Sequence, residues 1–316
     1  MSCCHTRRLL FRVLLDLITI SLVASGILII QGTKPYHRGF FCDDESIQYP
    51  LLSNTVPMQL AVYVGISVPV AVIALFEFTL RNSHRADVIS LRNANTGGSR
   101  SWLIATYSTV AVFIFGMAVT QFLTDMAKFS LGRLRPHFLA LCNPDFSKFN
   151  CSDGYITADV CTFKESFTAM DARLSFPSGH SSFSMYCMLY VILYLQARIV
   201  CKIAVLLKPF VQLVFFSLSF FTCLSRISDY MHHWSDVLAG AVLGIVVCVC
   251  VVLSLTDFGQ YLFHRGSVCE AESQPPVSSS SQDVEEGSGT PFYGSTSYKH
   301  LESQEQQRLL QPGQPK

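Results

Sequence analysis

The apolar residues of this chain are gathered into blocks that are each long enough to cross a lipid bilayer. A membrane-spanning helix needs about 20 mostly apolar residues. Six such blocks occur, at 9–30, 57–80, 101–124, 180–200, 206–225 and 237–256. Only 14% of the 316 residues are charged, whereas a soluble domain carries about 25%. The sequence therefore predicts an all-α, polytopic membrane protein with six transmembrane helices.

Basic residues between the blocks indicate the orientation. With the N-terminus in the cytosol, Arg7, Arg8 and the basic residues near 81–100 and 198–208 all lie on the cytosolic side, as the positive-inside bias requires. Loop 125–179 conflicts with this bias, because it carries six basic residues on the outer side. Long loops, however, translocate largely regardless of charge. We expect both termini in the cytosol and loops 31–56 and 125–179 outside, with the plasma membrane as the location.

Two features of the outer loops agree with this orientation. Asn150-Cys151-Ser152 is a glycosylation sequon. Cys42, Cys142, Cys151 and Cys161 also fall in these loops, where an oxidising compartment would permit one or two disulfides. The sequence leaves their connectivity open.

The composition divides the chain into three parts. Residues 1–8 form a short cytosolic N-terminus, and residues 9–265 form the membrane domain. From 266 to 316 the chain is rich in Ser, Gln and acidic residues and too polar to bury a core, so we predict a disordered cytosolic tail.

Polar residues cluster at the span ends that share one membrane face. The exits of odd spans and the entries of even spans lie on the same side, which is the outer side here. Parity alone therefore brings together groups that are far apart in sequence, namely Lys128, Arg135, Ser178, Gly179, His180, Arg226, His232 and Asp236.

Lys128 and Arg135 are suited to hold a phosphate. They are seven residues apart, so on a helix both lie on one face. An Arg fork and a Lys point charge complement a dianion. The alternative is that both side chains merely extend toward the membrane interface.

Ser178, Gly179 and His180 read as the start of a helix. Ser is a good N-cap, the first backbone N–H groups of a helix attract anions, and Gly179 permits close approach. His180 lies where it can protonate a leaving oxygen. The alternative is an ordinary capped helix with an interfacial histidine.

His232 and Asp236 are four residues apart and are expected on one helical face. A carboxylate bonded to one imidazole nitrogen leaves the other free to attack. Arg226 reaches the site only if the chain between spans five and six is non-helical. The alternative is a neutralising pair at a helix end, and His233 and His137 are rival nucleophiles.

Other ligands receive no support from the sequence. The histidines lack carboxylate or thiolate companions at metal-ligand spacing. No nucleic-acid motif or basic stripe occurs. We expect neither a metal nor a cofactor.

These motifs resemble the type 2 phosphatidate phosphatase superfamily. Its three-part signature reads here as Lys128-x6-Arg135-Pro136, Pro177-Ser178-Gly179-His180 and Ser225-Arg226-x5-His232-x3-Asp236. Lys34-Pro-Tyr-His-Arg-Gly-Phe and Gly132-Arg-Leu-Arg-Pro-His-Phe further resemble the animal phospholipid phosphatases. The resemblance covers about residues 8–265.

The resemblance implies a role for each residue. His232 would be the nucleophile that forms a phosphohistidine, oriented by Asp236, and His180 the general acid and base. Lys128, Arg135, Arg226, Ser178 and Gly179 would bind phosphate. It implies Mg²⁺-independent hydrolysis of phosphatidic acid, lysophosphatidic acid, sphingosine 1-phosphate and ceramide 1-phosphate, and homo- or hetero-oligomers with family members.

Two other classes compete with this interpretation. A catalytically silent family member would act as a membrane scaffold or interaction protein, but this chain keeps every motif residue. A transporter or channel would carry polar residues deep within several spans, and few occur.

Overall fold

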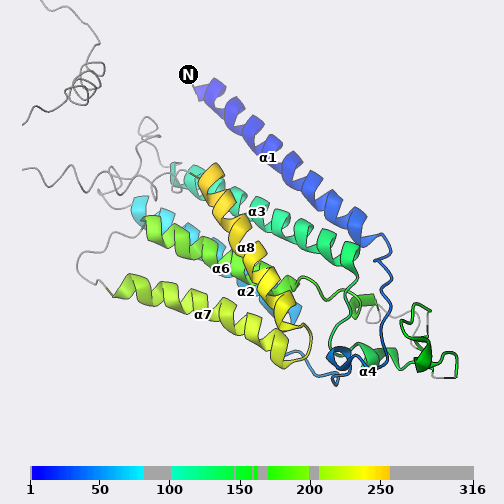
Figure 1. Ribbon diagram of the computed structural model, residues 1–316. Coiled ribbons are helices and arrows are strands. Elements are labelled where there is room, and N and C mark those ends of the chain that lie inside the picture. Colours follow the sequence, from blue (N-terminus) through cyan, green and yellow to red (C-terminus); the bar gives the residue numbers. More distant parts are fainter. Residues whose placement is uncertain are drawn as a thin grey trace, which may run out of the picture. The chain divides into compact units, whose positions relative to one another are not determined.

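The computed structural model describes residues 2–81, 101–145, 147–158, 160–162, 170–198 and 206–256. All of them fall within one compact unit, Met1–Cys269 (Figure 1). The predicted tail 266–316 lies outside the described residues. So does the end of the predicted membrane domain, from residue 257 to 265.

Six long helices make up the described bundle. They are α1 (Ser2–Gln31), α2 (Met58–Arg81), α3 (Ser101–Leu131), α6 (Gly179–Arg198), α7 (Leu207–Ser228) and α8 (Trp234–Leu255). A short helix α4 (Phe138–Cys142) and the 3-10 turns η1 (Glu45–Ile47) and η3 (Cys151–Asp153) lie in the connecting loops. The described residues contain no strand longer than an isolated bridge, which confirms the all-α prediction.

Five of these helices are long and apolar enough to cross a membrane. Their spans are Arg7–Gln31, Met58–Thr79, Trp102–Leu131, Leu207–Ser228 and Trp234–Leu255. Each overlaps a predicted block, which confirms a multi-pass membrane protein. The fourth block corresponds to α6, whose 20 residues suffice to cross a bilayer but whose composition is more polar. The count of six spans therefore remains a prediction.

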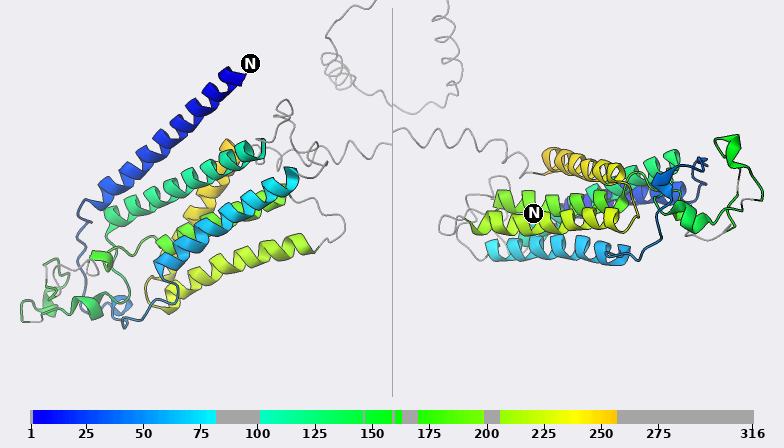
Figure 2. Two further views of the ribbon diagram at one scale, coloured as in Figure 1. Left: turned by 180° about the vertical axis from the view of Figure 1, so that it is seen from behind. Right: turned by 60° about the horizontal axis from the view of Figure 1, so that its bottom comes forward.

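The polarity of α6 follows from its position in the bundle. It packs against α2, α3, α7 and α8 (Figure 2), whereas α1 lies along α3. The tyrosines of α6 recur every four residues and donate to neighbouring helices. The Tyr186 and Tyr190 hydroxyls bond the carbonyls of Phe113 and Thr109 in α3, each at 2.9 Å. A helix that satisfies its polar groups inside the bundle does not need lipid-facing apolar residues.

Close contact between α6 and α8 depends on two glycines. A Cβ on Gly240 would lie 2.4 Å from the carbonyl oxygen of Ser178, and one on Gly244 would lie 2.4 Å from that of Ser182. Small residues allow helix backbones to approach this closely in membranes. Gly240 therefore holds α8 against the start of α6.

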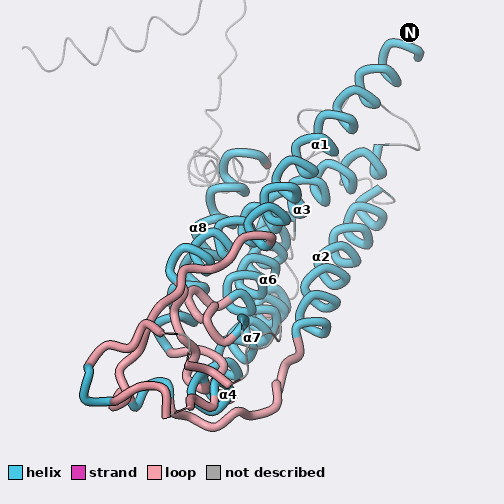
Figure 3. Tube along the Cα trace, turned by 90° about the vertical axis from the view of Figure 1, so that its right-hand side faces the viewer, coloured by secondary structure: helices cyan, strands magenta, loops and turns pink. Residues whose placement is uncertain are grey.

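The connecting loops that the structure describes gather at one end of the bundle, as the pink segments in Figure 3 show. They form a small core of their own around Phe40, Ile47, Phe138 and Ile156. Two disulfides join the expected cysteines, Cys42 to Cys151 and Cys142 to Cys161. The first ties the loop before α2 to the long loop after α3.

Candidate active site

All eight predicted site residues lie at the loop end of the bundle, at the last turn of α3 or α7, the start of α6 or α8, or in the loops between them. These ends share one face, as span parity predicts. Among the described residues no group of three or more His, Cys, Asp or Glu side chains is arranged to hold a metal ion. The predicted residues bring two imidazoles and three cationic side chains to this end of the bundle.

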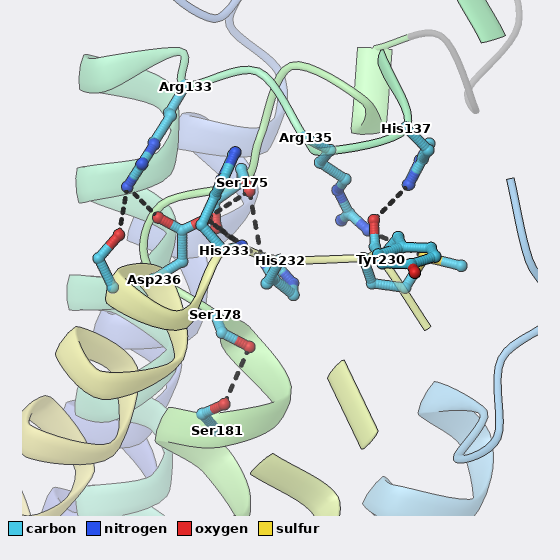
Figure 4. Close-up of polar contacts among 12 residues, drawn as sticks. Arg133, Arg135, His137, Ser175, Ser178, Ser181, Tyr230, His232, His233 and Asp236 are labelled. Atoms are coloured by element: carbon cyan, nitrogen blue, oxygen red, sulfur yellow. Dashed lines mark hydrogen bonds and ion pairs between the residues drawn. The ribbon is translucent and has the colours of Figure 1, made fainter. Parts of the chain in front are cut away.

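His232 lies in the turn between α7 and α8. Its main-chain N–H donates to the Arg226 carbonyl at 3.1 Å, which fixes the turn. Its Nδ1 lies 2.7 Å from the main-chain oxygen of Ser175 (Figure 4). Since a carbonyl only accepts, Nδ1 carries the hydrogen. Nε2 has no hydrogen-bond partner among the described residues and is available for attack.

The expected direct bond between His232 and Asp236 is not present. Helix α8 begins at Trp234, so His232 precedes the helix and does not share a helical face with Asp236. The Nδ1 of His232 lies 4.0 Å from Oδ2 of Asp236, beyond hydrogen-bond distance. Ser175 stands between them: its hydroxyl donates to Asp236 Oδ2 at 2.6 Å while its carbonyl accepts from His232.

Asp236 is held by several donors. Besides Ser175, it accepts from Arg133 and from both the main-chain N–H and Nδ1 of His233, at 3.1 and 3.0 Å. The Nε2 of His233 contacts the Ser46 carbonyl at 3.2 Å. Both ring nitrogens of His233 are thus engaged, which argues against His233 as the nucleophile and identifies it as the cap of α8.

His180 lies in the first turn of α6. Its ring is hydrogen-bonded to the main chain at Val56. Its Nε2 is buried and has no partner among the described residues, so the bond to Val56 uses Nδ1. An unpartnered buried nitrogen costs free energy and marks a position where a ligand atom would be satisfied.

Lys128 and Arg135 approach the site from different elements, contrary to the prediction of one helical face. Helix α3 ends at Leu131, and Gly132 has a φ of 53°, a left-handed conformation that suits glycine. Lys128 remains in the last turn, where its Nζ would lie 3.6 Å from a Cβ on Gly179. Arg135 enters from the loop, anchored by its N–H on the Ala172 carbonyl at 2.9 Å.

Arg135 keeps donors for an anion. Its Nη2 pairs with Asp171 at 2.7 Å, while its Nε is buried without a partner among the described residues. Burial lowers the pKa of Arg135, and the charge of Asp171 opposes that shift. The guanidinium therefore stays charged, with one buried N–H unsatisfied.

Arg226, in the last turn of α7, is 1% exposed and is the largest fully buried side chain among the described residues. It pairs with Asp229 at 2.8 Å. The chain after Ser228 is non-helical, as we expected if Arg226 is to reach the site, and this turn brings His232 back toward Arg226. The positive charges of Lys128, Arg135 and Arg226 are all close enough to act on His180, the general acid candidate.

His232 is electrostatically prepared to act as a neutral base or nucleophile. Burial, followed by the positive charges of Arg135 and Lys128, holds the pKa of His232 well below its usual value. The neutral ring is therefore the stable form near pH 7. Burial likewise lowers the pKa of His137, whose Nδ1 contacts the Tyr230 carbonyl at 2.9 Å, so His137 supports the turn.

Sequence reasoning missed several residues at this site. Ser175 and Arg133 lie between or beside motifs but carry no spacing signal of their own. Asn54, Thr55 and Asp229 contact the site from outside the motifs. Only the charge of Arg133 and Asp229 could have drawn attention to them.

The fold and the site together define a class: a multi-pass helical membrane protein with three cations and two imidazoles gathered at one end of its bundle. Comparison with known proteins assigns the family. Residues 109–259 match the PAP2 superfamily. The chain is 47% identical over 247 residues to phospholipid phosphatase 1 of Rattus norvegicus, covering 78% of this chain and 85% of the relative.

Two further relatives agree. Phospholipid phosphatase 2 of Mus musculus is 44% identical over 254 residues, 80% of this chain and 88% of the relative. A putative phosphatidate phosphatase of Drosophila melanogaster is 38% identical over 274 residues, 80% of this chain and 71% of the relative. No solved structure matches. The chain belongs to the phospholipid phosphatase family of the PAP2 superfamily and is a phosphatase.

Proposed function

We propose that this protein is a Mg²⁺-independent lipid phosphate phosphohydrolase that works through a phosphohistidine on His232. Its substrates are phosphatidic acid, lysophosphatidic acid, sphingosine 1-phosphate and ceramide 1-phosphate. The observation that carries the proposal is the pair of available imidazole nitrogens, Nε2 of His232 and Nε2 of His180, at a site with three cations. The relatives' names support the lipid phosphate class.

The first step is displacement at phosphorus. The three cations, Lys128, Arg135 and Arg226, bind the phosphate oxygens. The hydroxyl of Ser178 and the main-chain N–H of Gly179 donate to the same oxygens, because the N–H of Ser178 is already bonded to the Asp236 carbonyl at 3.0 Å. His232 Nε2 attacks phosphorus as the bond from phosphorus to the lipid oxygen breaks. Protonated His180 gives its proton to that oxygen, and the lipid alcohol leaves. The arriving phosphate dianion offsets the cations and favours protonated His180.

The second step is hydrolysis of the phosphohistidine. His180, now neutral, takes a proton from water as the water oxygen attacks phosphorus. The bond between phosphorus and His232 Nε2 breaks, and inorganic phosphate leaves. Three cations can offset the charge of the phosphoryl group, which is why the proposal requires no Mg²⁺.

We also propose a location and an orientation in the membrane. The membrane domain is 9–265, with residues 1–8 and the tail 266–316 in the cytosol and the site facing the outside or a lumen, at the plasma membrane. The exposed side chain of Asn150 is the proposed glycosylation site. We also propose homo- or hetero-oligomers with family members.

Phosphate release from phosphatidate in detergent micelles tests the activity. We expect turnover that persists in EDTA and is blocked by vanadate. Intact cells should also hydrolyse lysophosphatidate added outside. Activity that needs permeabilised cells would contradict the orientation, and no turnover of any of the four lipids would favour the silent scaffold.

A further inference from the structure

Three consecutive residues that precede α2, Asn54, Thr55 and Val56, each contact a different part of the candidate active site. They end the first outer loop and belong to none of the signature motifs. We call them the 54–56 strap. Asn54 is 172 residues from Arg226 in sequence, so this contact exists only because the loop folds back over the site.

Asn54 binds the buried cation of the site. Its side-chain oxygen accepts from Nη1 of Arg226 at 2.8 Å. The Nε and Nη2 of Arg226 donate to the Ser225 hydroxyl at 3.2 and 3.1 Å, and Nη2 also donates to Asp229. A guanidinium has five N–H donors. Four are engaged with described residues, and the fifth, on Nη1 beside Asn54, remains for an anion.

Thr55 binds the carboxylate that pairs with Arg226. Its main-chain N–H donates to Oδ2 of Asp229 at 2.8 Å, and its hydroxyl donates to Oδ1 at 2.7 Å. Asp229 Oδ2 in turn accepts from Arg226 at 2.8 Å. Thr55 therefore fixes the rotation of Asp229 and, through it, one edge of the guanidinium.

The rest of the loop is anchored to the turn that carries the nucleophile. The Tyr49 ring stacks on Tyr230 with centroids 4.6 Å apart. The N–H of Tyr49 donates to the Pro136 carbonyl at 3.0 Å. Val56 is buried, and the main chain there bonds the ring of His180. These contacts hold the strap in place against the site.

From these contacts we propose that Asn54 and Thr55 are positioning residues that aim the unused Nη1 donor of Arg226 at the substrate phosphate. The inference rests on the proposed function, in which Arg226 binds that phosphate. Asn54 and Thr55 act through Arg226 and are not themselves catalytic residues. Their loss should weaken phosphate binding in both the ground state and the transition state, without removing the nucleophile.

The test compares purified full-length variants by their inhibition constant for vanadate and by KM and kcat for phosphatidate in micelles. Asn54→Ala removes the acceptor. Thr55→Val removes the hydroxyl at nearly constant shape, and Thr55→Ser keeps it. Ser53→Ala is the matched control, because Ser53 is an exposed neighbour outside the strap.

A hydrogen bond to a charged group contributes enough that we expect about a tenfold rise in the vanadate inhibition constant and in KM for Asn54→Ala. Thr55→Val keeps the main-chain bond to Asp229, so we expect a rise of only about threefold in the vanadate inhibition constant and in KM. Thr55→Ser and Ser53→Ala should match wild type. If Asn54→Ala does not fold, the comparison of Thr55→Val with Thr55→Ser decides.

Equal vanadate inhibition in wild type and Asn54→Ala, or in Thr55→Val and Thr55→Ser, would overturn the inference. A lower melting temperature with an unchanged vanadate inhibition constant would also overturn the inference, because that result would show a structural role alone. His232→Ala, assayed in parallel, separates the two hypotheses. Full turnover in that variant would refute the proposed function, and the vanadate comparison reports on the strap independently.

Discussion

The main-chain oxygen of Ser175 lies 2.7 Å from Nδ1 of His232, whereas Oδ2 of Asp236 lies 4.0 Å from the same nitrogen. The imidazole is therefore oriented by a backbone carbonyl, and the carboxylate acts on it through Ser175. A main-chain acceptor cannot rotate away as a side chain can. This arrangement separates two roles that a carboxylate in direct contact would combine, namely fixing the tautomer and supplying negative charge.

Replacing Ser175 by Ala should lower kcat. The substitution keeps the carbonyl that orients His232 and removes the hydroxyl that holds Asp236 at 2.6 Å. A hydrogen bond to a charged group is worth about 1.5–3 kcal/mol, so we expect a loss of about tenfold or more in kcat. Ser219→Ala is the control, because Ser219 is equally buried and its hydroxyl bonds Phe216 within α7. Equal kcat in the two variants would contradict the role of Ser175.

Acid should destabilise the protein partly through His232. The pKa of His232 is lowered in the folded state, so below about pH 6.5 the unfolded chain binds a proton that the folded site does not. Stability is therefore lost as pH falls from about 6.5 toward the folded pKa, by at most about 1.4 kcal/mol per pH unit. Melting temperatures in detergent between pH 7.5 and 5 measure this.

His232→Gln should show a shallower decline of melting temperature over the same pH range. Part of the decline should remain, because the pKa of His137 is lowered as well and that ring must also take up a proton on unfolding. If the melting temperatures of wild type and His232→Gln declined in parallel with pH, the result would contradict the conclusion that His232 is buried in its neutral form.

Removing either disulfide should destabilise the loop end of the molecule. The bridge between Cys42 and Cys151 closes a sequence separation of 109 residues, and that between Cys142 and Cys161 one of 19. Chain entropy gives about 5 and about 3 kcal/mol for these loops. We expect a larger drop in melting temperature for Cys42→Ser than for Cys161→Ser. The reverse order would show that the long loop is held mainly by its own packing.

Much of the fold was predictable because bilayer crossing imposes a strict length and composition on helices. Each of the five apolar spans overlaps a predicted block. Helix α6 (Gly179–Arg198) also coincides with a predicted block, 180–200, but it is more polar than the five spans. Its Tyr186 and Tyr190 hydroxyls are satisfied by α3, and a hydropathy value counts polar atoms without regard to their partners. The disulfide pairing could not be predicted, because four cysteines allow three connectivities and the sequence does not distinguish them.

At the site, span parity predicted which residues would share one end of the bundle, but helical spacing misplaced two of them. Arg135 and His232 lie outside the helices that the spacing assumed, because α3 ends before Gly132 and α8 begins only at Trp234. Asn54 and Ser175 could not be found from sequence. Each acts through contacts with residues distant along the chain, and neither type is distinctive by itself.

We expect His232 to become phosphorylated during turnover. Wild-type enzyme mixed with ³²P-labelled phosphatidate and quenched in alkali, where phosphohistidine persists, should carry label. His232→Ala should carry none and should lose at least about a thousandfold in kcat, as expected when a nucleophile is removed. Label of equal intensity in His232→Ala, or turnover equal to wild type, would contradict the claim.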